Sequence, residues 1–243
     1  MSKTVFVTGT ARGIGRATVV EFAENGWDII AHARTQTEAF EEDIADLAKI
    51  NEVSVTPVYF DMLDTEAMKQ CVVGLKRSKV VIDALVNNAG IAHGGSFQMT
   101  PVSTIRDVFD VNLFSHMELT QLALKLMTGE DPSIVNVASV AGIDFRGGNS
   151  AYGVSKAALI AWTKVLQVEL HGKVRVNAVA PGLTETDMAQ EMEDKLQAIT
   201  LSHGIIDRLA RPEEIAKAIF YLSSNKASFI TGQVLKVDGG GGI

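Results

Sequence analysis

The sequence predicts an α/β fold in which one doubly wound, seven-stranded parallel sheet carries helices on both faces. Short β-branched runs, each ending near Gly, Asn or Asp, alternate with stretches of ten or more residues that have helical spacing. Most strand-like runs are largely apolar, as at residues 134–138 and 174–180, which is typical of parallel strands covered on both faces. No linker, repeat or low-complexity tract divides the chain, so a single domain over residues 1–243 is expected.

The alternation gives each element its place in the chain. Strands are predicted at residues 4–8, 28–33, 53–60, 84–87, 133–138, 174–180 and 233–237. Helices are predicted at residues 13–24, 37–50, 64–77, 101–127, 151–171 and 212–223. The least regular part is polar and follows the sixth strand. Residues 183–204 are therefore predicted to form a flexible flap on the substrate side, which orders when ligand binds.

The composition argues against several classes of protein. With 22 basic and 29 acidic side chains, a net charge of -7 and a pI near 5.3, the chain lacks the basic surface of a nucleic-acid-binding protein. No apolar run approaches the roughly 18 residues of a membrane helix, and no signal peptide precedes the first strand. The single Cys71 cannot form an internal disulfide, which favours a reducing, cytoplasmic location. The five histidines have no spacing with Cys, Asp or Glu that predicts a metal site.

The first strand leads into a Gly-rich turn that is a candidate nucleotide site. Glycines at this point allow a tight turn and let the backbone approach a pyrophosphate, which then sits at the positive end of the following helix. The alternative is an ordinary turn between strand and helix, but its place before an apolar-faced helix favours nucleotide binding. The candidate contacts are Gly9, Thr10, Arg12, Gly13, Ile14 and Gly15.

Further motifs follow the later strands in a fixed order. Asn87-Asn88-Ala89-Gly90 follows the fourth strand, Ser139 the fifth, Tyr152-x-x-x-Lys156 opens the next helix, and Pro181-Gly182 closes the sixth strand. Together with Thr8-Gly-x-x-x-Gly-x-Gly15 and Asn112, this order resembles the short-chain dehydrogenase/reductase family over nearly the whole chain. Within that family the sequence is most similar to 3-oxoacyl-acyl-carrier-protein reductases. The resemblance implies a Rossmann-like fold and a nicotinamide coenzyme.

Reduction of a carbonyl needs a proton donor that works near neutral pH, and Tyr152 is the candidate. Lys156 lies one helical turn on, so its ammonium is expected to favour the phenolate, whose free pKa is about 10. Lys156 also holds the nicotinamide ribose in this family. Ser139 can hydrogen-bond the substrate oxygen, and the resemblance implies that Asn112 bends its helix and holds a water linked to the lysine.

Each of these residues has a structural alternative. Tyr-x-x-x-Lys occurs by chance in many helices, Ser139 could cap a turn, and Asn112 could be a polar residue within a helix. Their joint occurrence after the expected elements favours the catalytic interpretation.

The end of the second strand predicts NADP(H) as the coenzyme. No acidic residue stands there to bind the ribose hydroxyls, whereas Arg34 and the nearby Arg12 could converge on a 2′-phosphate. The alternative is that Arg34 is a solvated loop charge. The remaining coenzyme contacts implied by the resemblance are Asp61 and Met62 at the adenine, Asn88, Ala89 and Gly90 beneath the ribose, and Gly182, Thr184 and Thr186 near the nicotinamide and pyrophosphate.

One of these positions has a structural alternative: Asp61 could instead cap the helix that starts near Asp64. Asn87, which precedes the ribose contacts, is expected to pin adjacent strands.

The leading substrate is a 3-oxoacyl group carried by an acyl-carrier protein. Glu130 and Asp131 stand where basic residues usually grip that acidic partner, and Lys125, Lys173 and Arg175 are possible substitutes. A free ketone, sugar or polyol is the alternative substrate, and a catalytically silent NADP-binding module is a further alternative.

The resemblance also predicts a homotetramer that forms through the helices at 101–127 and 151–171. These helices carry more apolar residues than one core-facing stripe needs. The residues taken as the surplus are Val108, Leu119, Ile160, Trp162 and Val165.

Overall fold

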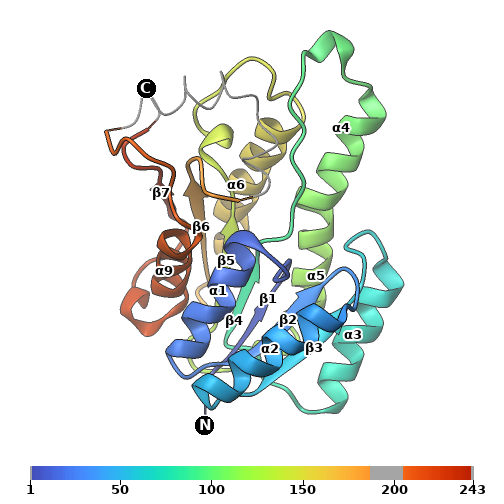
Figure 1. Cartoon of the computed structure of the whole chain (residues 1–243), viewed down its shortest axis with the longest axis vertical. Helices are drawn as coiled ribbons and strands as arrows, with labels where there is room; N and C mark the ends of the chain where they lie inside the picture. Colours follow the sequence, from blue (N-terminus) through green and yellow to red (C-terminus); the bar gives the residue numbers. More distant parts are fainter. Residues whose placement is uncertain (1, 187–204, 242–243) are drawn as a thin grey trace.

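A seven-stranded sheet runs through the computed structural model, which describes residues 2–186 and 205–241 (Figure 1). Its strands lie in the order β3-β2-β1-β4-β5-β6-β7, and every neighbouring pair is parallel, as the sequence predicted. The strands are β1 (Thr4–Val7), β2 (Asp28–Ala33), β3 (Val55–Tyr59), β4 (Ala84–Asn87), β5 (Ser133–Val137), β6 (Arg175–Pro181) and β7 (Val234–Val237). All of their carboxyl ends therefore meet at one edge, where such sheets bind ligands.

Helices cover both faces of the sheet, and each face has its own core. One face carries α1 (Gly13–Glu24), α2 (Glu38–Asn51) and α9 (Pro212–Ser223), and the other carries α3 (Thr65–Arg77), α5 (Ser115–Ala123) and α6 (Tyr152–Glu169). Along β1 the side chains alternate between the cores: Val5 and Val7 pack with α1, whereas Phe6 packs with α3 and α5. All three are fully buried, which explains why the strand has no polar face.

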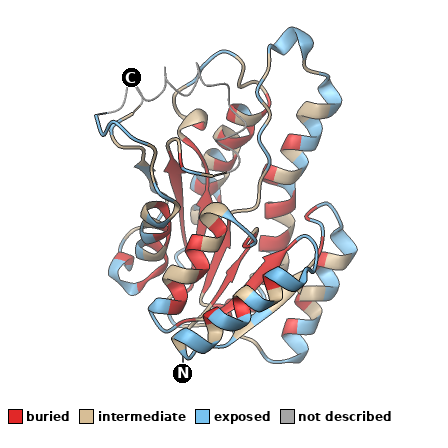
Figure 2. Cartoon of the chain, in the orientation of Figure 1, coloured by how far each residue is buried: buried red, intermediate tan, exposed pale blue. Residues whose placement is uncertain are grey.

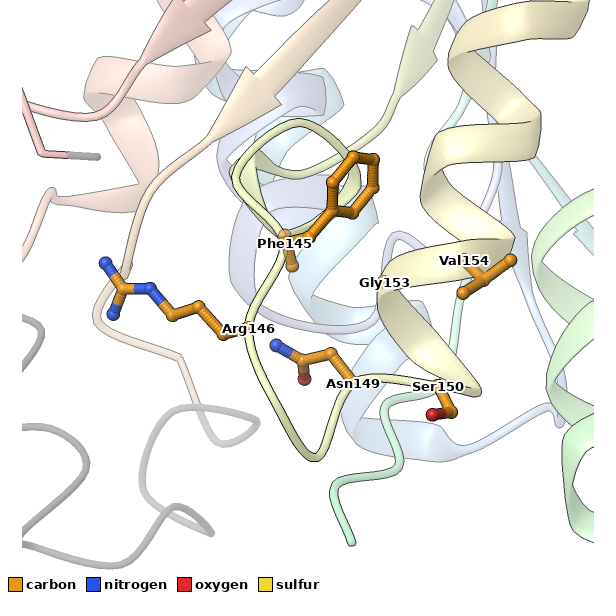
Figure 3. Close-up of a pocket in the computed structure, with 7 residues that line it drawn as sticks. Phe145, Arg146, Asn149, Ser150, Gly153 and Val154 are labelled. Atoms are coloured by element: carbon orange, nitrogen blue, oxygen red, sulfur yellow. The ribbon is translucent and has the colours of Figure 1, made fainter. Parts of the chain in front are cut away.

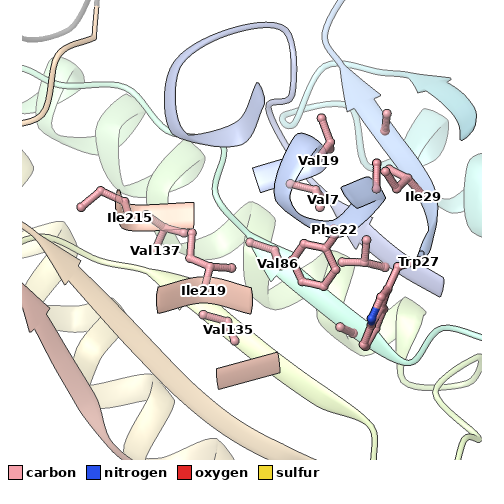
Figure 4. Close-up of a cluster of buried hydrophobic side chains, with 14 of the residues drawn as sticks. Val7, Val19, Phe22, Trp27, Ile29, Val86, Val135, Val137, Ile215 and Ile219 are labelled. Carbon is pink, nitrogen blue, oxygen red and sulfur yellow. The ribbon is translucent and has the colours of Figure 1, made fainter. Parts of the chain in front are cut away.

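The first core contains an aromatic contact between α1 and Trp27, the residue before β2. Phe22 and Trp27 meet edge to face with ring centroids 5.1 Å apart, beside Val86 and Ile219 (Figure 4). Burial of such large side chains supplies most of the driving force that holds α1 and α9 on the sheet. Figure 2 shows the result: the central strands are buried, the edge strands β3 and β7 are partly exposed, and exposed residues lie on the outer surfaces of the helices.

The helix predicted at residues 101–127 is divided into three segments. An α-helix, α4 (Val102–Phe109), passes into a π-helical turn, η2 (Asp110–Phe114), and then into α5, which ends at Ala123. A π-turn accommodates one extra residue per turn and bends the helix at that point. The helix ends four residues earlier than predicted, and beyond its end the Leu126 carbonyl accepts a hydrogen bond from Ile82 N at 2.9 Å, ahead of β4.

Asn87 pins adjacent strands, as predicted. It lies opposite Asn136 of β5, and its amide nitrogen is 2.8 Å from the Asn136 side-chain oxygen and 3.1 Å from the Thr120 hydroxyl. Asn136 in turn donates to Thr163 of α6 at 2.8 Å. The two asparagines therefore connect the centre of the sheet to α5 and α6.

Two further expectations concern the flap and the membrane. Of the flap expected at 183–204, residues 187–204 lie outside the described residues. In the part of the chain that the structure describes, none of the helices has both the length and the apolarity needed to cross a membrane.

Candidate active site

The Gly-rich turn lies at the carboxyl end of β1 and opens α1, as predicted. Gly9 has φ +71°, a left-handed conformation that favours glycine. A Cβ atom at Gly15 would lie 2.0 Å from the Gly9 carbonyl oxygen and 2.6 Å from Asn88 Nδ2. The turn therefore folds back tightly on the start of α1, and it leaves the helix N-terminus next to the segment after β4.

Thr8 braces that segment, a role that the sequence analysis did not assign. Its hydroxyl oxygen accepts hydrogen bonds from Asn88 N and Ala89 N, each at 2.9 Å. The Asn88 side chain donates to the Thr8 carbonyl at 2.8 Å and so holds β1 and β4 together. The sequence did single out Thr8, because it is the first residue of the motif Thr8-Gly-x-x-x-Gly-x-Gly15.

His32 of β2 holds the other side of the turn. Its Nδ1 accepts a hydrogen bond from Gly9 N at 3.1 Å, and its carbonyl accepts from both the backbone N (2.8 Å) and the hydroxyl (3.0 Å) of Thr10. The Thr10 side chain is fully buried in this contact, so it positions the turn and does not face a ligand. The sequence alone gives no sign of this role, because it shows only that His32 lacks the spacing of a metal ligand.

A second buried histidine, His116 of α5, supports the segment after β4. Its Nε2 donates to the Ala89 carbonyl at 2.7 Å, and burial lowers its pKa to about 3, so the ring is neutral. It therefore fixes the backbone that the resemblance places beneath the coenzyme ribose.

The predicted phosphate-binding arginines emerge at the same edge of the sheet. Arg12 is the exposed residue before α1, and Arg34 is exposed directly after β2. Because β1 and β2 pair with Val7 opposite Ala31, the two strands deliver these arginines to neighbouring positions.

Asp61 and Met62 follow β3 at the same edge. Asp61 is exposed and accepts from Leu63 N at 2.9 Å, whereas Asp64 caps α3 by accepting from Ala67 N at 2.9 Å. The alternative in which Asp61 caps α3 is therefore wrong. The Met62 side chain packs in the core, so only its backbone can meet a ligand.

The segment after β6 runs back towards the Gly-rich turn. Gly182 N donates to the Val237 carbonyl at 3.0 Å, and Thr184 forms a parallel bridge with Ala210. A Cβ at Gly13 would lie 3.2 Å from the Thr186 methyl group, which places this threonine beside the start of α1.

The catalytic candidates come together where β5 and α6 meet. Ser139, two residues beyond the end of β5, is almost fully buried, and Tyr152 is the first residue of α6. The Lys156 Nζ lies 5.8 Å from the centroid of the Tyr152 ring and donates to the Val137 carbonyl at 2.7 Å. The predicted pairing of the two side chains on one face of α6 is therefore present.

The electrostatics of the pair differ from the expectation. Burial raises the pKa of Tyr152, and a hydrogen bond with the Ser139 side chain opposes this shift. Burial also lowers the pKa of Lys156 to about 8. The expected lowering of the tyrosine pKa by Lys156 is absent: burial is the larger cause of the shift, and the Ser139 hydrogen bond is what opposes it. Tyr152 is consequently a protonated acid at neutral pH, the state that can donate a proton.

Ser139 also has the capping role considered above. It accepts from Ala141 N at 3.1 Å and so starts the short 3-10 helix η3 (Val140–Gly142). The cap and the contact with Tyr152 coexist, because a hydroxyl oxygen accepts and donates at the same time.

Asn112 lies fully buried in the π-turn η2, which is the bend that the resemblance implied. Its amide oxygen accepts from Ile91 N at 2.9 Å, and its nitrogen donates to the Ile91 carbonyl (2.9 Å) and to the Ser155 hydroxyl (3.0 Å). Ser155 donates to the Tyr152 carbonyl at 2.7 Å. Asn112 therefore ties the loop after β4 to the start of α6.

Two loops border the catalytic candidates, and a hydrogen bond joins them. Gly95 N, in the loop after β4, donates to the Gly148 carbonyl, in the loop before α6, at 3.0 Å. The second loop is also anchored by Asp144, whose carboxylate lies 3.1 Å from Lys236 of β7.

A pocket of about 120 Å³ opens on the loop before α6 (Figure 3). This volume is below the roughly 300 Å³ at which ligand pockets begin, and neither Ser139 nor Tyr152 lines it. Figure 3 shows Arg146 extending away from α6. The pocket therefore lies beside the catalytic candidates and does not contain Ser139 or Tyr152. It is lined by Ala141, Phe145, Arg146, Asn149, Ser150, Gly153 and Val154.

Arg175, a candidate for docking a carrier protein, does not lie on the surface. Arg175 is buried, lies 2.9 Å from Asp131, and donates to the Leu222 and Ser224 carbonyls. It cannot contribute to a basic surface, and it neutralises one of the two acidic residues. Among the described residues, no group of His, Cys, Asp and Glu could hold a metal ion.

Comparison with known proteins places this arrangement in a family. The family model described as Enoyl-(Acyl carrier protein) reductase matches residues 9–241. A 3-oxoacyl-[acyl-carrier-protein] reductase of Thermotoga maritima is 37% identical over 243 residues, covering 98% of this chain and 97% of the relative.

Two solved structures show the same fold. A short chain dehydrogenase from Burkholderia cenocepacia J2315 in complex with NADP is 29% identical, with a TM-score of 0.90 over 98% of this chain and 97% of that one. A 7 alpha-hydroxysteroid dehydrogenase complexed with NADH and 7-oxo glycochenodeoxycholic acid is 27% identical, with a TM-score of 0.91 over 99% and 94% of the two chains. The Ser139, Tyr152 and Lys156 arrangement, the parallel sheet and these full-length matches agree, and the chain belongs to the short-chain dehydrogenase/reductase family of oxidoreductases.

Proposed function

We propose that the protein reduces a 3-oxoacyl thioester, carried by an acyl-carrier protein, to the 3-hydroxyacyl form with NADPH. The observation that carries the proposal is the contact of Tyr152 with Ser139 and Lys156 at the edge of the sheet where the Gly-rich turn also lies. Tyr152 is held protonated and donates its proton to the substrate oxygen, which Ser139 binds. NADPH, when bound, supplies the hydride.

The chain's residues fit such a coenzyme. The tight turn at Gly9 and Gly15 presents the N-terminus of α1 to a pyrophosphate, and Thr186 lies beside it. Arg12 and Arg34 are exposed at the same edge, which supports binding of a 2′-phosphate, and no carboxylate stands at the end of β2 to repel it. The exposure of Asp61 after β3 supports a contact with the adenine, and the position of Lys156 next to Gly90 supports a contact with the nicotinamide ribose.

The substrate assignment is supported by the similarity to 3-oxoacyl-[acyl-carrier-protein] reductases and by the pairing of Asp131 with Arg175. That pairing removes one of the two charges expected to repel an acidic carrier. Glu130 stays exposed, as are Lys125 and Lys173. A free ketone is the second candidate, because the steroid dehydrogenase of similar fold is bound to a 7-oxo bile acid.

The test compares substrates and coenzymes in one assay of NADPH absorbance. Acetoacetyl carrier protein should be reduced at least about tenfold more efficiently than the corresponding free thioester, a difference of about 1.4 kcal/mol. Equal or better turnover of simple ketones or sugars would assign the second candidate. Tight NADPH binding without turnover on the whole panel would make the protein a silent binding module.

The coenzyme preference is tested separately with Arg34→Ala. This change should raise the Kd for NADPH by at least about tenfold and leave that for NADH almost unchanged, because only NADPH carries the 2′-phosphate. A wild-type protein that binds both coenzymes within a factor of ten would contradict the assignment.

A further inference from the structure

We propose that His32 is a positioning residue of the coenzyme site, whose neutral ring holds the Gly-rich turn against the ends of β2 and β3, so that its protonation weakens coenzyme binding. The proposal rests on the proposed binding of coenzyme at this turn. It goes beyond that binding, because it assigns the order of the site to a buried ring that touches no ligand itself.

Both ring nitrogens of His32 have backbone partners in the two neighbouring segments. Nδ1 lies 3.1 Å from Gly9 N, a donor, and Nε2 lies 2.9 Å from the Phe60 carbonyl, an acceptor. Only the neutral tautomer with its proton on Nε2 satisfies both contacts. The ring lies 4.1 Å from the Phe60 ring between centroids, and only 2% of the residue is exposed, so water cannot replace either partner.

These contacts join three segments to which coenzyme contacts were assigned. Gly9 belongs to the turn before α1, Arg34 stands two residues beyond His32, and Asp61 directly follows Phe60. The His32 carbonyl also accepts both hydrogen bonds of Thr10. A single residue therefore sets the position of the pyrophosphate turn relative to the residues assigned to the 2′-phosphate and adenine.

Protonation would break this arrangement at one defined bond. A proton on Nδ1 turns the acceptor into a donor that faces the Gly9 N–H, and the turn must move or lose its bond. Burial lowers the pKa of His32 below its usual 6.5, whereas the Phe60 carbonyl and the Asp61 carboxylate oppose this shift. His116 on α5 is the other ionisable group coupled to the ring, and it stays neutral. The ring is neutral at physiological pH, and the bond is lost as the pH falls below 6.5 through the pKa of the folded protein.

Two substitutions separate the contacts of the ring. In His32→Asn the side-chain oxygen can take the place of Nδ1 and accept from Gly9, and it does not titrate. In His32→Gln the amide nitrogen can take the place of Nε2 and donate to Phe60, but no acceptor faces Gly9. His171→Asn is the matched control, because it makes the same exchange at an exposed residue after α6.

The experiment measures the Kd for NADPH by fluorescence titration at pH 7.5 and pH 5.0, at constant ionic strength. The rise in Kd between the two values should be at least about threefold larger for wild type and His171→Asn than for His32→Asn. His32→Gln should bind more weakly than His32→Asn at pH 7.5. The 2′-phosphate itself titrates near pH 6. If the rise in Kd for wild type were less than threefold larger than that for His32→Asn, the weaker binding at pH 5.0 would be due to that phosphate, and the proposal would be overturned.

A second readout uses the free protein and does not depend on coenzyme. Nitrogen-15 NMR of the wild-type protein at pH 7.5 should show His32 as the Nε2-protonated tautomer, and the Gly9 amide signal should shift along the same titration curve as the ring. The other tautomer, or a Gly9 amide indifferent to the titration, would overturn the proposal even if a variant fails to fold. Absence of NADPH binding by wild type at pH 7.5, with this NMR result intact, would instead count against the proposed coenzyme.

Discussion

At the scale of single residues, the hydroxyl of Ser139 performs two tasks. It accepts from Ala141 N, which fixes the start of η3, and its hydrogen bond with Tyr152 lowers the pKa of that phenol. The serine is held in place by the backbone that it caps, so its hydroxyl is already oriented before a substrate arrives. Preorganised groups of this kind contribute more to rate than mobile ones.

Tyr152→Phe removes the proton donor and leaves the ring. Loss of a general acid typically costs a factor of about 10² to 10⁴, so turnover should fall at least about a hundredfold while the Kd for NADPH stays nearly the same. A steady-state assay measures turnover, and a binding titration measures the Kd for NADPH. Tyr221→Phe, an exposed tyrosine on α9, is the matched control and should keep full activity. Retention of more than a few per cent of turnover in Tyr152→Phe would contradict the acid role.

The pKa of Lys156 predicts a pH dependence. Its folded-state value of about 8 lies below its usual 10.5, so the ammonium is present at pH 7 and is lost as the pH rises through about 8. Because kcat/KM reports the free enzyme, kcat/KM for NADPH should fall above pH 8. A pH profile from 6 to 10 measures this. A flat profile up to pH 9.5 would mean that the ammonium is not required.

At the scale of the elements, the start of α1 depends on close packing of backbone against backbone. Gly15→Ala would place a Cβ 2.0 Å from the Gly9 carbonyl, where no flexible side chain can move aside. We expect a loss of about 1–3 kcal/mol in the free energy of unfolding and a large loss of NADPH affinity.

Gly74→Ala is the control for this substitution. Gly74 lies exposed within α3, and an added Cβ would meet no atom within 4 Å. It should stabilise the protein by roughly 0.5–1 kcal/mol. Urea unfolding of both variants measures the difference, and equal stability of Gly15→Ala and wild type would show that the turn can relax.

The regular elements were predictable from local sequence, whereas the π-turn was not. Strands β2 and β4 and helices α1 and α9 have the predicted bounds, because alternation and apolar spacing determine them within a few residues. The π-turn η2 inserts only one extra residue, so the spacing of apolar residues along the chain is almost that of an unbroken helix. Residues 101–127 were therefore predicted as one continuous helix. His32 was also missed as a structural residue, because its two partners, Gly9 and Phe60, are distant in sequence.

At the scale of the whole molecule, the apolar surface differs in detail from the expectation. Val108 and Leu119 are buried within the chain, and Ile160 and Trp162 are partly buried against its core. Of the predicted surplus, Val165 is exposed. It belongs to a stripe on α6 with the alternating four- and three-residue spacing of a coiled-coil seam. The stripe consists of Val154, Ala158, Ala161, Val165 and Val168.

This stripe is compatible with the predicted homotetramer. We expect α6 to pack there against α6 of a second copy. Val165→Glu would bury a charge in that contact and should reduce the mass in solution from four chains to two. Lys164→Glu, on the neighbouring face of the helix, should leave the mass unchanged. Light scattering at micromolar concentration measures both. A wild-type mass of one chain would contradict the tetramer.

At this scale, the sequence could not predict contacts between residues that are far apart in the chain. Asp131 and Arg175 were weighed as separate surface charges, but β5 and β6 are neighbours in the sheet and bring the two residues into contact. The clustering of Ser139, Tyr152 and Lys156 was predictable, because it rests on motifs that follow strands. The charge balance around the site required the topology.

The bond between Gly95 and Gly148 makes one rim out of two stretches that are more than fifty residues apart in sequence. If only one of these loops were replaced by that of a relative, the new backbone would lack its hydrogen-bond partner in the other loop. Redesign of substrate preference in this scaffold should therefore exchange residues 91–100 and 143–151 together, as a paired cassette.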